Sequence, residues 1–179
     1  MHEVRAAVAE RAAEAFLDEV VTWRELAFHT ASRHAEADRY ASLRPWSRAT
    51  LAAHVDDPRP AIYLLGALET AGTDDPLWNA AQRQLRAEGV IHPALRMLWG
   101  KRVLTWTQTP EEAWDSLFSL NDRWAIDGRD PSSIGGIAWV FGRYDRPWPT
   151  RPIFGQVRSM TSNSAARKWK LAAYLRRWS

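Results

Sequence analysis

The chain has 179 residues, of which 46% are hydrophobic and 25% charged, with a net charge of +3, and this balance is typical of a globular domain rather than a disordered segment. It contains no cysteine, which excludes disulfide bonds and thiolate metal ligands. No apolar run approaches the roughly 20 residues that a membrane span needs, and the five histidines lack metal-ligand spacing, so we expect a cytoplasmic protein with neither a membrane partner nor a metal.

The positive charge is concentrated at the C-terminal end. From Arg143 to Ser179 there are nine lysines and arginines and one acidic residue, so this part carries +8 and the rest of the chain −5. A basic segment of this kind suits a phosphate-rich partner such as nucleic acid, although a solvated basic surface is a common alternative.

The first part of the chain has helical spacing of apolar residues. Phe16, Val20 and their neighbours predict one long helix from about Glu3 to Ala37, with a break near Thr30 as the alternative. Two shorter helices are expected after it, from Ser47 to Val55 and from Ala61 to Ala71, because prolines interrupt the chain between them.

The middle of the chain contains four predicted helix starts, and each of them consists of a polar residue followed by proline. Proline suits the first helical position because no N–H is needed there. Thr109 and Glu112 together predict a capping box, and Gly89 is a plausible helix stop. The four starts are Asp75-Pro76, His92-Pro93, Thr109-Pro110 and Asp130-Pro131.

The last part begins with a loop rich in proline and arginine, from Arg143 to Pro152. A closing helix is predicted from about Ala165 to Trp178, with Asn163 or Ser164 as its N-cap. No alternation with a period of two is sustained anywhere, so no sheet is expected. The sequence therefore predicts a single, compact, all-α, multi-helix domain.

Several short segments, in this order, resemble the C-terminal part of the flavin-binding domain of class II DNA photolyases, which use blue light to repair cyclobutane pyrimidine dimers. The resemblance runs from about Phe16 to the C-terminus, and Asp130 to Ile134 departs from it by reading DPSSI where the family has DPNGY. The matching segments are DPLWNAAQ, LRMLWGKRVLTW, LND, DGRDP, YDRPW and RPIFG.

The resemblance implies the second half of the photolyase helical domain, without the N-terminal antenna domain or the helices and loop that hold the flavin diphosphate. We therefore expect FAD as the cofactor but poor binding by this chain alone, because affinity needs contacts on all sides of a ligand. A second chain could supply the missing half. The family is a carbon–carbon lyase, and this chain by itself is expected to be inactive or incomplete as an enzyme.

Seven of the eleven tryptophans lie between Trp78 and Trp148, more than a core of this size needs. Trp99 and Trp106 are seven residues apart, so two helical turns place them on one face. Trp78 lies on the preceding helix. By resemblance these three form an electron-transfer chain to the flavin; the alternative is that they only fill the core.

The resemblance also assigns residues to the flavin and to catalysis. Asn121 is placed at the reactive ring nitrogen, and Asp127, paired with Arg96, at the polar edge of the ring. An ordinary surface ion pair is the alternative for the last two. The residues expected at the cofactor are Arg24, Arg96, Asn121, Asp127, Gly128 and Arg129, of which the last three belong to the DGRDP segment.

The remaining assignments concern DNA that contains a pyrimidine dimer, the expected partner. A dimer flipped out of the duplex needs flat walls and one acid to bond to its bases. By resemblance Trp23 and Trp139 are the walls and Glu19 is the catalytic acid. A basic loop is expected to enter the gap in the duplex, through Arg146, Trp148 and Arg158, and an irregular surface loop is the alternative.

Two other functions remain open from the sequence. One is a flavin-less remnant that acts as a helical DNA-binding or partner-binding module. The other is a photoreceptor of the cryptochrome kind, which would keep the tryptophan chain but not repair.

Overall fold

A computed structural model describes residues 13–14 and 16–179 of the chain, and this part is built from helices and loops. Within it, the only backbone bridge of the β type joins Arg151 and Gly155. The all-α prediction is confirmed. Among the described residues, no helix is both long enough and apolar enough to span a bilayer.

The described helices follow one another closely along the chain. They are η1 (Asp18–Trp23), α2 (Arg24–Arg33), η2 (Tyr40–Ser42), α3 (Pro45–Ala53), α4 (Leu65–Glu69), α5 (Pro76–Glu88), α6 (Pro93–Trp106), α7 (Pro110–Trp124), α8 (Pro131–Val140), α9 (Ser162–Lys168) and α10 (Ala172–Trp178).

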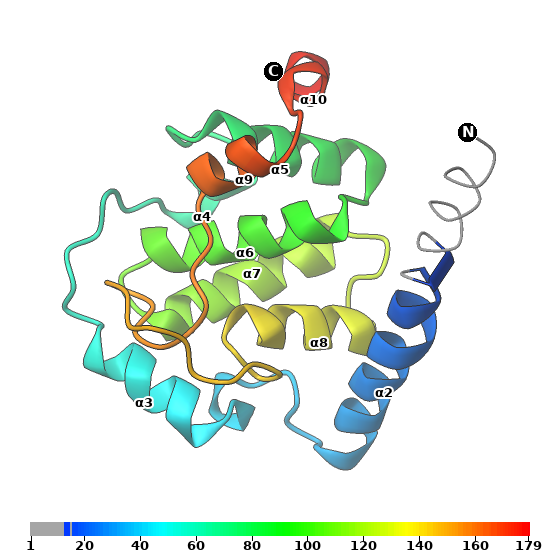
Figure 1. The fold of residues 1–179 in the computed structure, drawn as a ribbon, viewed down its shortest axis with the longest axis vertical. Coiled ribbons are helices and arrows are strands. Elements are labelled where there is room, and N and C mark those ends of the chain that lie inside the picture. The colour runs from blue at the N-terminus through cyan, green and yellow to red at the C-terminus, as the bar shows by residue number, and fades with distance from the viewer. Residues whose placement is uncertain (1–12, 15) are drawn as a thin grey trace.

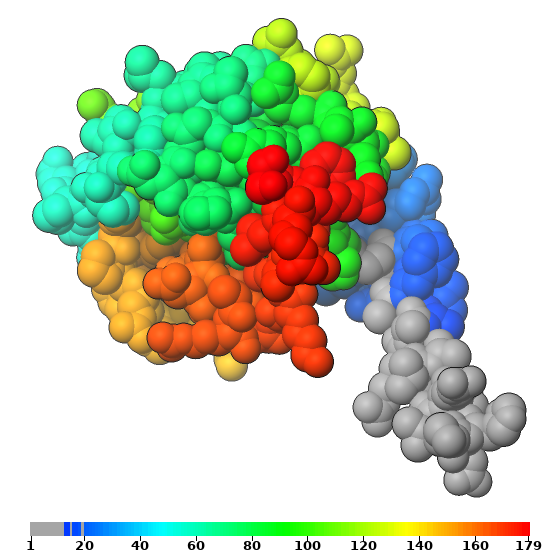
Figure 2. Space-filling model, turned by 90° about the horizontal axis from the view of Figure 1, so that it is seen from above, coloured from blue at the N-terminus to red at the C-terminus, as the bar shows by residue number. Residues whose placement is uncertain are grey.

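The antiparallel helices α6 and α7 form the centre of the domain (Figure 1). On one side α5 packs against α6, and α10 packs against α5; on the other side α8 packs against both α6 and α7, and α2 packs against α8. The segment between α8 and α9 runs back across the domain and returns the chain to the α5 side (Figure 1). Seen from above, the C-terminal helices lie on the surface of α5 and α6 (Figure 2).

The helix starts in the middle of the chain agree with the sequence. Each predicted N-cap side chain accepts a hydrogen bond from a backbone N–H in the first turn of the helix that follows, and Gly89 ends α5 with φ 72°. Glu112 bonds to the N–H of Gln108 rather than of Thr109, so the predicted capping box is only half formed. The confirmed N-caps are Asp75, His92, Thr109 and Asp130.

The predicted N-terminal helix is shorter at its C-terminal end than expected. It stops at Arg33 rather than near Ala37, and its stretch Asp18–Trp23 is a π-helix; residues 3–12 of the prediction lie outside the described part. Ala37 is buried, and its carbonyl accepts a hydrogen bond from Arg143, more than a hundred residues away. The chain beyond the helix end is thus held by a long-range contact that local spacing does not reveal.

The predicted helix from Ala61 to Ala71 is also shorter in the structure, where only Leu65–Glu69 is helical. The preceding residues are extended because Tyr63 donates its backbone N–H to the carbonyl of Trp106, 3.1 Å away. A tertiary contact has again replaced the expected helical turn.

The predicted C-terminal helix is two helices. The first, α9, begins earlier than expected with Thr161 as its N-cap, in a capping box with Ser164, and ends at Lys168. Trp169 is extended, with φ −123° and ψ 148°. Trp169 and Leu171 pack with the buried cluster formed by Leu77, Leu95, Leu98 and Ala165, and this packing turns α10 onto α5.

Two glycines allow close helix crossings that position the candidate site. A Cβ at Gly100 would lie 2.5 Å from Val140 Cγ2, so α6 and α8 approach closely there. A Cβ at Gly135 would lie 2.9 Å from the Cβ of Ala27, where α8 crosses α2. A side chain at either place would push these helices apart.

Candidate functional site

Three buried tryptophans from α5 and α6 lie in contact at the centre of the fold. Trp78, Trp99 and Trp106 are each at most 2% exposed. The rings of Trp78 and Trp99 are parallel within 2°, with centroids 6.5 Å apart, and those of Trp78 and Trp106 meet edge to face at 5.4 Å. Trp78 therefore lies between the other two, and the three indoles form one continuous file of π systems.

The two inner indoles of this file donate hydrogen bonds to neutral oxygens. Trp78 Nε1 donates to the carbonyl of Trp99 at 2.9 Å, and Trp99 Nε1 donates to Gln82 Oε1 at 2.8 Å. Gln82 is fully buried. Gln82 was not among the residues predicted from the sequence, although it follows Trp78 by four residues and so lies on the same face of α5.

The outer end of the file reaches a cleft. The ring of Tyr63 meets Trp106 edge to face at 5.3 Å, and the guanidinium carbon of Arg102 lies 4.4 Å from the centre of the Trp106 ring. Trp106 also lines a cleft of about 580 Å³ together with residues of α5, α9 and the segment before α4. Trp106 is thus the member of the file that borders this cleft.

Arg96, one helical turn before Trp99 on α6, joins three other polar residues. Its guanidinium donates to both carboxylate oxygens of Asp127, at 2.7 and 2.9 Å, and to the Ser133 hydroxyl at 3.0 Å. It also donates to the amide oxygen of Asn121. The structure therefore brings together three of the residues that the resemblance places at the flavin.

The charge state of Asp127 depends on this cluster. Burial by itself raises the pKa of Asp127, but the hydrogen bonds and positive charge of Arg96 outweigh it, so the pKa lies below its ordinary value. Ser133 donates to the backbone carbonyl of Asp127 at 2.7 Å. The second serine of DPSSI, where the family has glycine, thus adds a hydroxyl to the cluster that sequence reasoning had missed.

The cluster fits the polar edge of a flavin ring in part. Arg96 and Asp127 have side chains 27% and 35% exposed, so a bound molecule can reach both, and a guanidinium suits an anionic reduced ring. Asn121 is fully buried, and its amide oxygen accepts from Arg96. A ring at this edge could therefore contact Asn121 only after the side chains that cover it have moved.

The other residues predicted at the cofactor have structural partners. A Cβ at Gly128 would lie 2.9 Å from the Cα of Asp122, so glycine is required where this loop crosses α7. Arg129 is exposed, with φ 66°, and its N–H donates to Asp122 Oδ1. Arg24 is exposed on α2, where its guanidinium lies over the Phe28 ring at 4.5 Å.

A second aromatic cluster lies where α2 and η1 meet α8. The ring centroids of Trp23 and Trp139 are 4.3 Å apart, and Tyr144 lies 6.3 and 6.0 Å from them. Trp139 Nε1 donates to Asp145 Oδ1, and Trp23 Nε1 donates to Asp18 Oδ2. The structure thus brings together two residues, more than a hundred positions apart, that the resemblance assigns to the lesion.

The contact between these indoles limits how they could hold a base. At 4.3 Å no base fits between Trp23 and Trp139, so in this arrangement they offer one joint surface rather than two facing walls. Glu19, the predicted acid, belongs to the π-helical stretch, and its side chain lies outside the described part of the structure.

The predicted DNA-binding loop follows α8 directly. Arg146 is exposed, and Trp148 is 40% exposed with the guanidinium of Arg158 at 5.1 Å from its ring centre. The backbone of Trp148 is held by a 2.8 Å hydrogen bond to Gln156. Trp148 and Arg158 therefore form one stacked surface pair.

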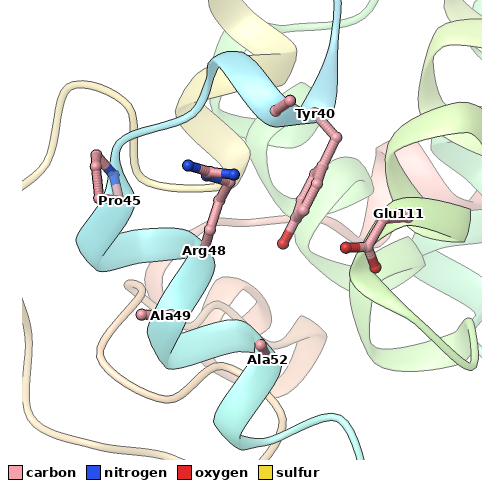
Figure 3. Close-up of a pocket in the computed structure, with 7 residues that line it drawn as sticks. Tyr40, Pro45, Arg48, Ala49, Ala52 and Glu111 are labelled. Atoms are coloured by element: carbon pink, nitrogen blue, oxygen red, sulfur yellow. The ribbon is translucent and has the colours of Figure 1, made fainter.

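A different cleft, also about 580 Å³, lies between α3 and the start of α7 (Figure 3). Tyr40, Arg48 and Glu111 face it, and burial together with the charge of Glu111 raises the pKa of Tyr40. It contains none of the predicted site residues. Across the described residues, no group of three or more His, Cys, Asp and Glu side chains could hold a metal ion.

Comparison with known proteins identifies relatives but no matching family model. The chain is 43% identical over 175 residues to the deoxyribodipyrimidine photo-lyase of Methanothermobacter thermautotrophicus, an alignment that covers 95% of this chain and 39% of the relative. It is 41% identical to the enzymes of the same name from Oryza sativa subsp. japonica and Potorous tridactylus, covering 92% and 90% of this chain but 33% and 31% of those relatives. Over nearly all of its length the chain is thus related to the deoxyribodipyrimidine photo-lyases, and it spans 31% to 39% of the length of these relatives.

Proposed function

We propose that this chain forms part of a flavoprotein that repairs cyclobutane pyrimidine dimers in DNA with the energy of light. The observation that carries the proposal is the file of Trp106, Trp78 and Trp99, which leads from an open cleft to within one helical turn of the Arg96–Asp127 edge. The sequence relationship to the photo-lyases supports the same function.

Each group of residues has a distinct part in this proposal. When bound at the Arg96–Asp127 edge, reduced FAD would supply, on absorbing light, the electron that opens the dimer. The tryptophan file would carry electrons from an external reductant to the flavin bound at that edge. Arg96 would stabilise negative charge there, and Asp127, ionised because of Arg96, would fix the orientation of the guanidinium.

The DNA would contact the opposite end of α8. Trp23 and Trp139 would offer their joint surface to the flipped dimer, and Glu19 would hydrogen-bond to its bases. Arg146, Trp148 and Arg158 would contact the duplex around the gap, where guanidinium and indole groups can stack on unpaired bases.

The chain alone is expected to bind FAD weakly and in less than equimolar amount. In the described part, the polar edge offers Arg96 and Asp127 but covers Asn121, so contacts come from one side only. Adding a polypeptide that covers the 60% or so of the Methanothermobacter relative that this chain does not match should restore tight binding. FAD fluorescence titration, with and without that polypeptide, measures both results.

Two arginine variants make this test specific. In the reconstituted assembly Arg96→Leu should weaken FAD binding by about 10- to 100-fold, since it removes charge-assisted hydrogen bonds. Arg123→Leu, which removes an exposed arginine of α7 that pairs with Glu69 at the end of α4, should leave the affinity unchanged. Equimolar, tight binding by the chain alone would contradict the expectation of a one-sided site.

Binding to DNA is expected to depend strongly on salt, because phosphate contacts by the basic C-terminal part release counterions. In a flavin-loaded assembly, duplex that contains a dimer should bind more tightly than undamaged duplex. Trp139→Ala should remove this preference while leaving nonspecific binding nearly intact, and Arg146→Ala should weaken binding to damaged DNA by about 1–3 kcal/mol, the value of one stacking contact. Competition titrations at two salt concentrations measure these differences.

The matched control for Arg146 is Arg151→Ala, an exposed arginine of the same loop whose backbone bonds to Gly155. It should lower affinity for both duplexes equally. Equal affinity of the native assembly for damaged and undamaged DNA would exclude repair.

A second candidate function is a flavin-less module that binds DNA or another chain. The burial of Asn121 favours it, because a cofactor cannot reach the predicted ring-nitrogen contact in this arrangement. Exposed apolar side chains at the start of the described region point to a protein partner: Phe16 is 65%, Leu17 56% and Val21 54% exposed. Failure of the reconstituted assembly to bind FAD would exclude the flavoprotein and favour this second function.

A further inference from the structure

We infer that Gln82 is a positioning residue for electron transfer, because it keeps the indole proton of Trp99 in place while that ring is oxidised. This inference rests on the proposed role of the tryptophan file. The amide oxygen of Gln82 accepts the Trp99 N–H at 2.8 Å, and the two side chains are 0% and 2% exposed. This hydrogen bond is therefore shielded from water, and the amide oxygen of Gln82 is the acceptor that holds the indole proton.

The chemistry of an oxidised indole makes this partner important. Loss of one electron makes the indole N–H far more acidic, and a base within hydrogen-bond distance can then take the proton and leave a neutral radical. A carboxamide oxygen accepts a hydrogen bond but is far too weak a base to remove the proton. Trp99 therefore remains a radical cation, which is a stronger oxidant than the neutral radical.

As a consequence, the electron vacancy moves from Trp99 toward Trp106. Oxidised Trp99 takes one electron from Trp78, and no proton needs to move, because the Trp78 N–H is also held by a neutral oxygen, the Trp99 carbonyl. Trp78 in turn takes one electron from Trp106, which lines the open cleft. A base at position 82 would instead trap the vacancy at Trp99 as a neutral radical.

The amide is itself fixed by its surroundings. Gln82 Nε2 points toward the carbonyl of Glu69 at the end of α4, at 3.4 Å, which orients the amide with its oxygen toward Trp99. The bond between Gln82 and Trp99 also joins α5 to α6, so the same contact holds the stacked rings of Trp78 and Trp99 parallel.

A covalently attached photo-oxidant can test the inference without flavin. The chain has no cysteine, so Ile126→Cys, at a position 79% exposed and next to Asp127, accepts a single ruthenium polypyridyl label. Trp124→Phe in the same protein removes the indole nearest to the label in sequence. Flash oxidation with an external quencher should then give a tryptophan radical cation that vanishes in a further Trp99→Phe variant.

The decisive variant is Gln82→Glu, which keeps the shape and introduces a base. Because burial raises the pKa of a carboxyl group, the effect should appear as the pH is raised. At low pH this variant should behave like the native side chain; at higher pH the radical should become neutral, with absorption at shorter wavelength, a solvent deuterium isotope effect and slower transfer to Trp78. Gln84→Glu, the same substitution two residues away on α5 facing Tyr174, should change none of these.

Each other result would overturn the inference. A neutral Trp99 radical in the protein with native Gln82, or identical radicals in the Gln82→Glu variant at every pH, would show that Gln82 does not control the proton. The absence of any Trp99-dependent signal would show that Trp99 is not an electron carrier, and the positioning role of Gln82 would fall with it. Since the label replaces the flavin, these results are independent of whether the FAD titration or the damaged-DNA test succeeds.

Discussion

Replacing Trp99 with phenylalanine is expected to abolish light-driven reduction of the flavin in a reconstituted assembly while leaving FAD bound. Phenylalanine fills most of the same volume but is much harder to oxidise than an indole. Trp99 is the member of the file nearest in sequence to Arg96, and Trp78 lies on its far side, so its loss should interrupt the path at the first step. Steady illumination with an external reductant, followed by flavin absorbance, measures the effect.

Trp114→Phe is the matched control for this experiment. Trp114 is 2% exposed, as is Trp99, and its indole N–H also has a single acceptor, the carbonyl of Asp38 at 2.9 Å. Trp99→Phe leaves the buried amide oxygen of Gln82 without its donor, at a cost of about 1–3 kcal/mol in the free energy of unfolding. Trp114→Phe frees the carbonyl of Asp38, which belongs to an exposed residue. Equal photoreduction in the two variants would mean that Trp99 only fills the core.

The helix starts could be predicted because they are chemically local. Asp75, His92, Thr109 and Asp130 each satisfy N–H groups within three residues, so neighbouring sequence contains all the information needed. Gly89 is local in the same sense, since its left-handed φ is a property of that residue.

The helix ends that were wrong depend on partners far away in the chain. Arg143 bonds to Ala37, Tyr63 bonds to Trp106, and Trp169 packs on the Leu95 cluster. Periodicity in one segment cannot reveal a contact with another, so the long N-terminal helix, the helix from Ala61 and the single C-terminal helix were each predicted too long.

The residues of the candidate site likewise fall into those that could be predicted from the sequence and those that could not. The resemblance named Trp23 and Trp139, and the structure shows these indoles in contact; it named Arg96 and Asp127, and the structure joins them by two hydrogen bonds. Buried polar partners were missed, because glutamine or serine at one position carries no pattern of its own. Gln82 and Ser133 become visible only once α5 lies beside α6 and the loop before α8 lies beside Arg96.

A buried lysine was missed for the same reason. Lys101 on α6 is 1% exposed, and its ammonium donates to the carbonyl of Val140 at the end of α8. Burial lowers the pKa of Lys101 to about 7; nearby Asp145 opposes this effect and Arg158 adds to it. At neutral pH this group therefore lies near the midpoint of its titration in the folded protein, although a lysine in the unfolded chain stays charged up to about pH 10.

Replacing Lys101 with methionine should therefore stabilise the protein at pH 6. The folded state there carries a charge that its surroundings disfavour, and a pKa lowered from about 10 to about 7 corresponds to roughly 4 kcal/mol. Loss of the bond to Val140 offsets about 1 kcal/mol of this, leaving a gain on the order of 3 kcal/mol. Denaturant unfolding of the isolated chain at pH 6 measures it, with exposed Lys170→Met as the control that should change little.

The pH dependence gives a second and stricter measurement of the same group. Between about pH 7 and pH 10 the unfolded chain binds the Lys101 proton and the folded protein does not, so the native protein should gain stability as the pH rises through this window, by up to about 1.4 kcal/mol per pH unit. The Lys101→Met variant lacks this contribution, so its advantage should shrink steadily, disappear near pH 9 and reverse by about 1 kcal/mol, the value of the lost bond to Val140, by pH 10. Parallel stability curves for the two proteins would show that Lys101 is as readily charged in the fold as in water, and that its burial does not govern its protonation.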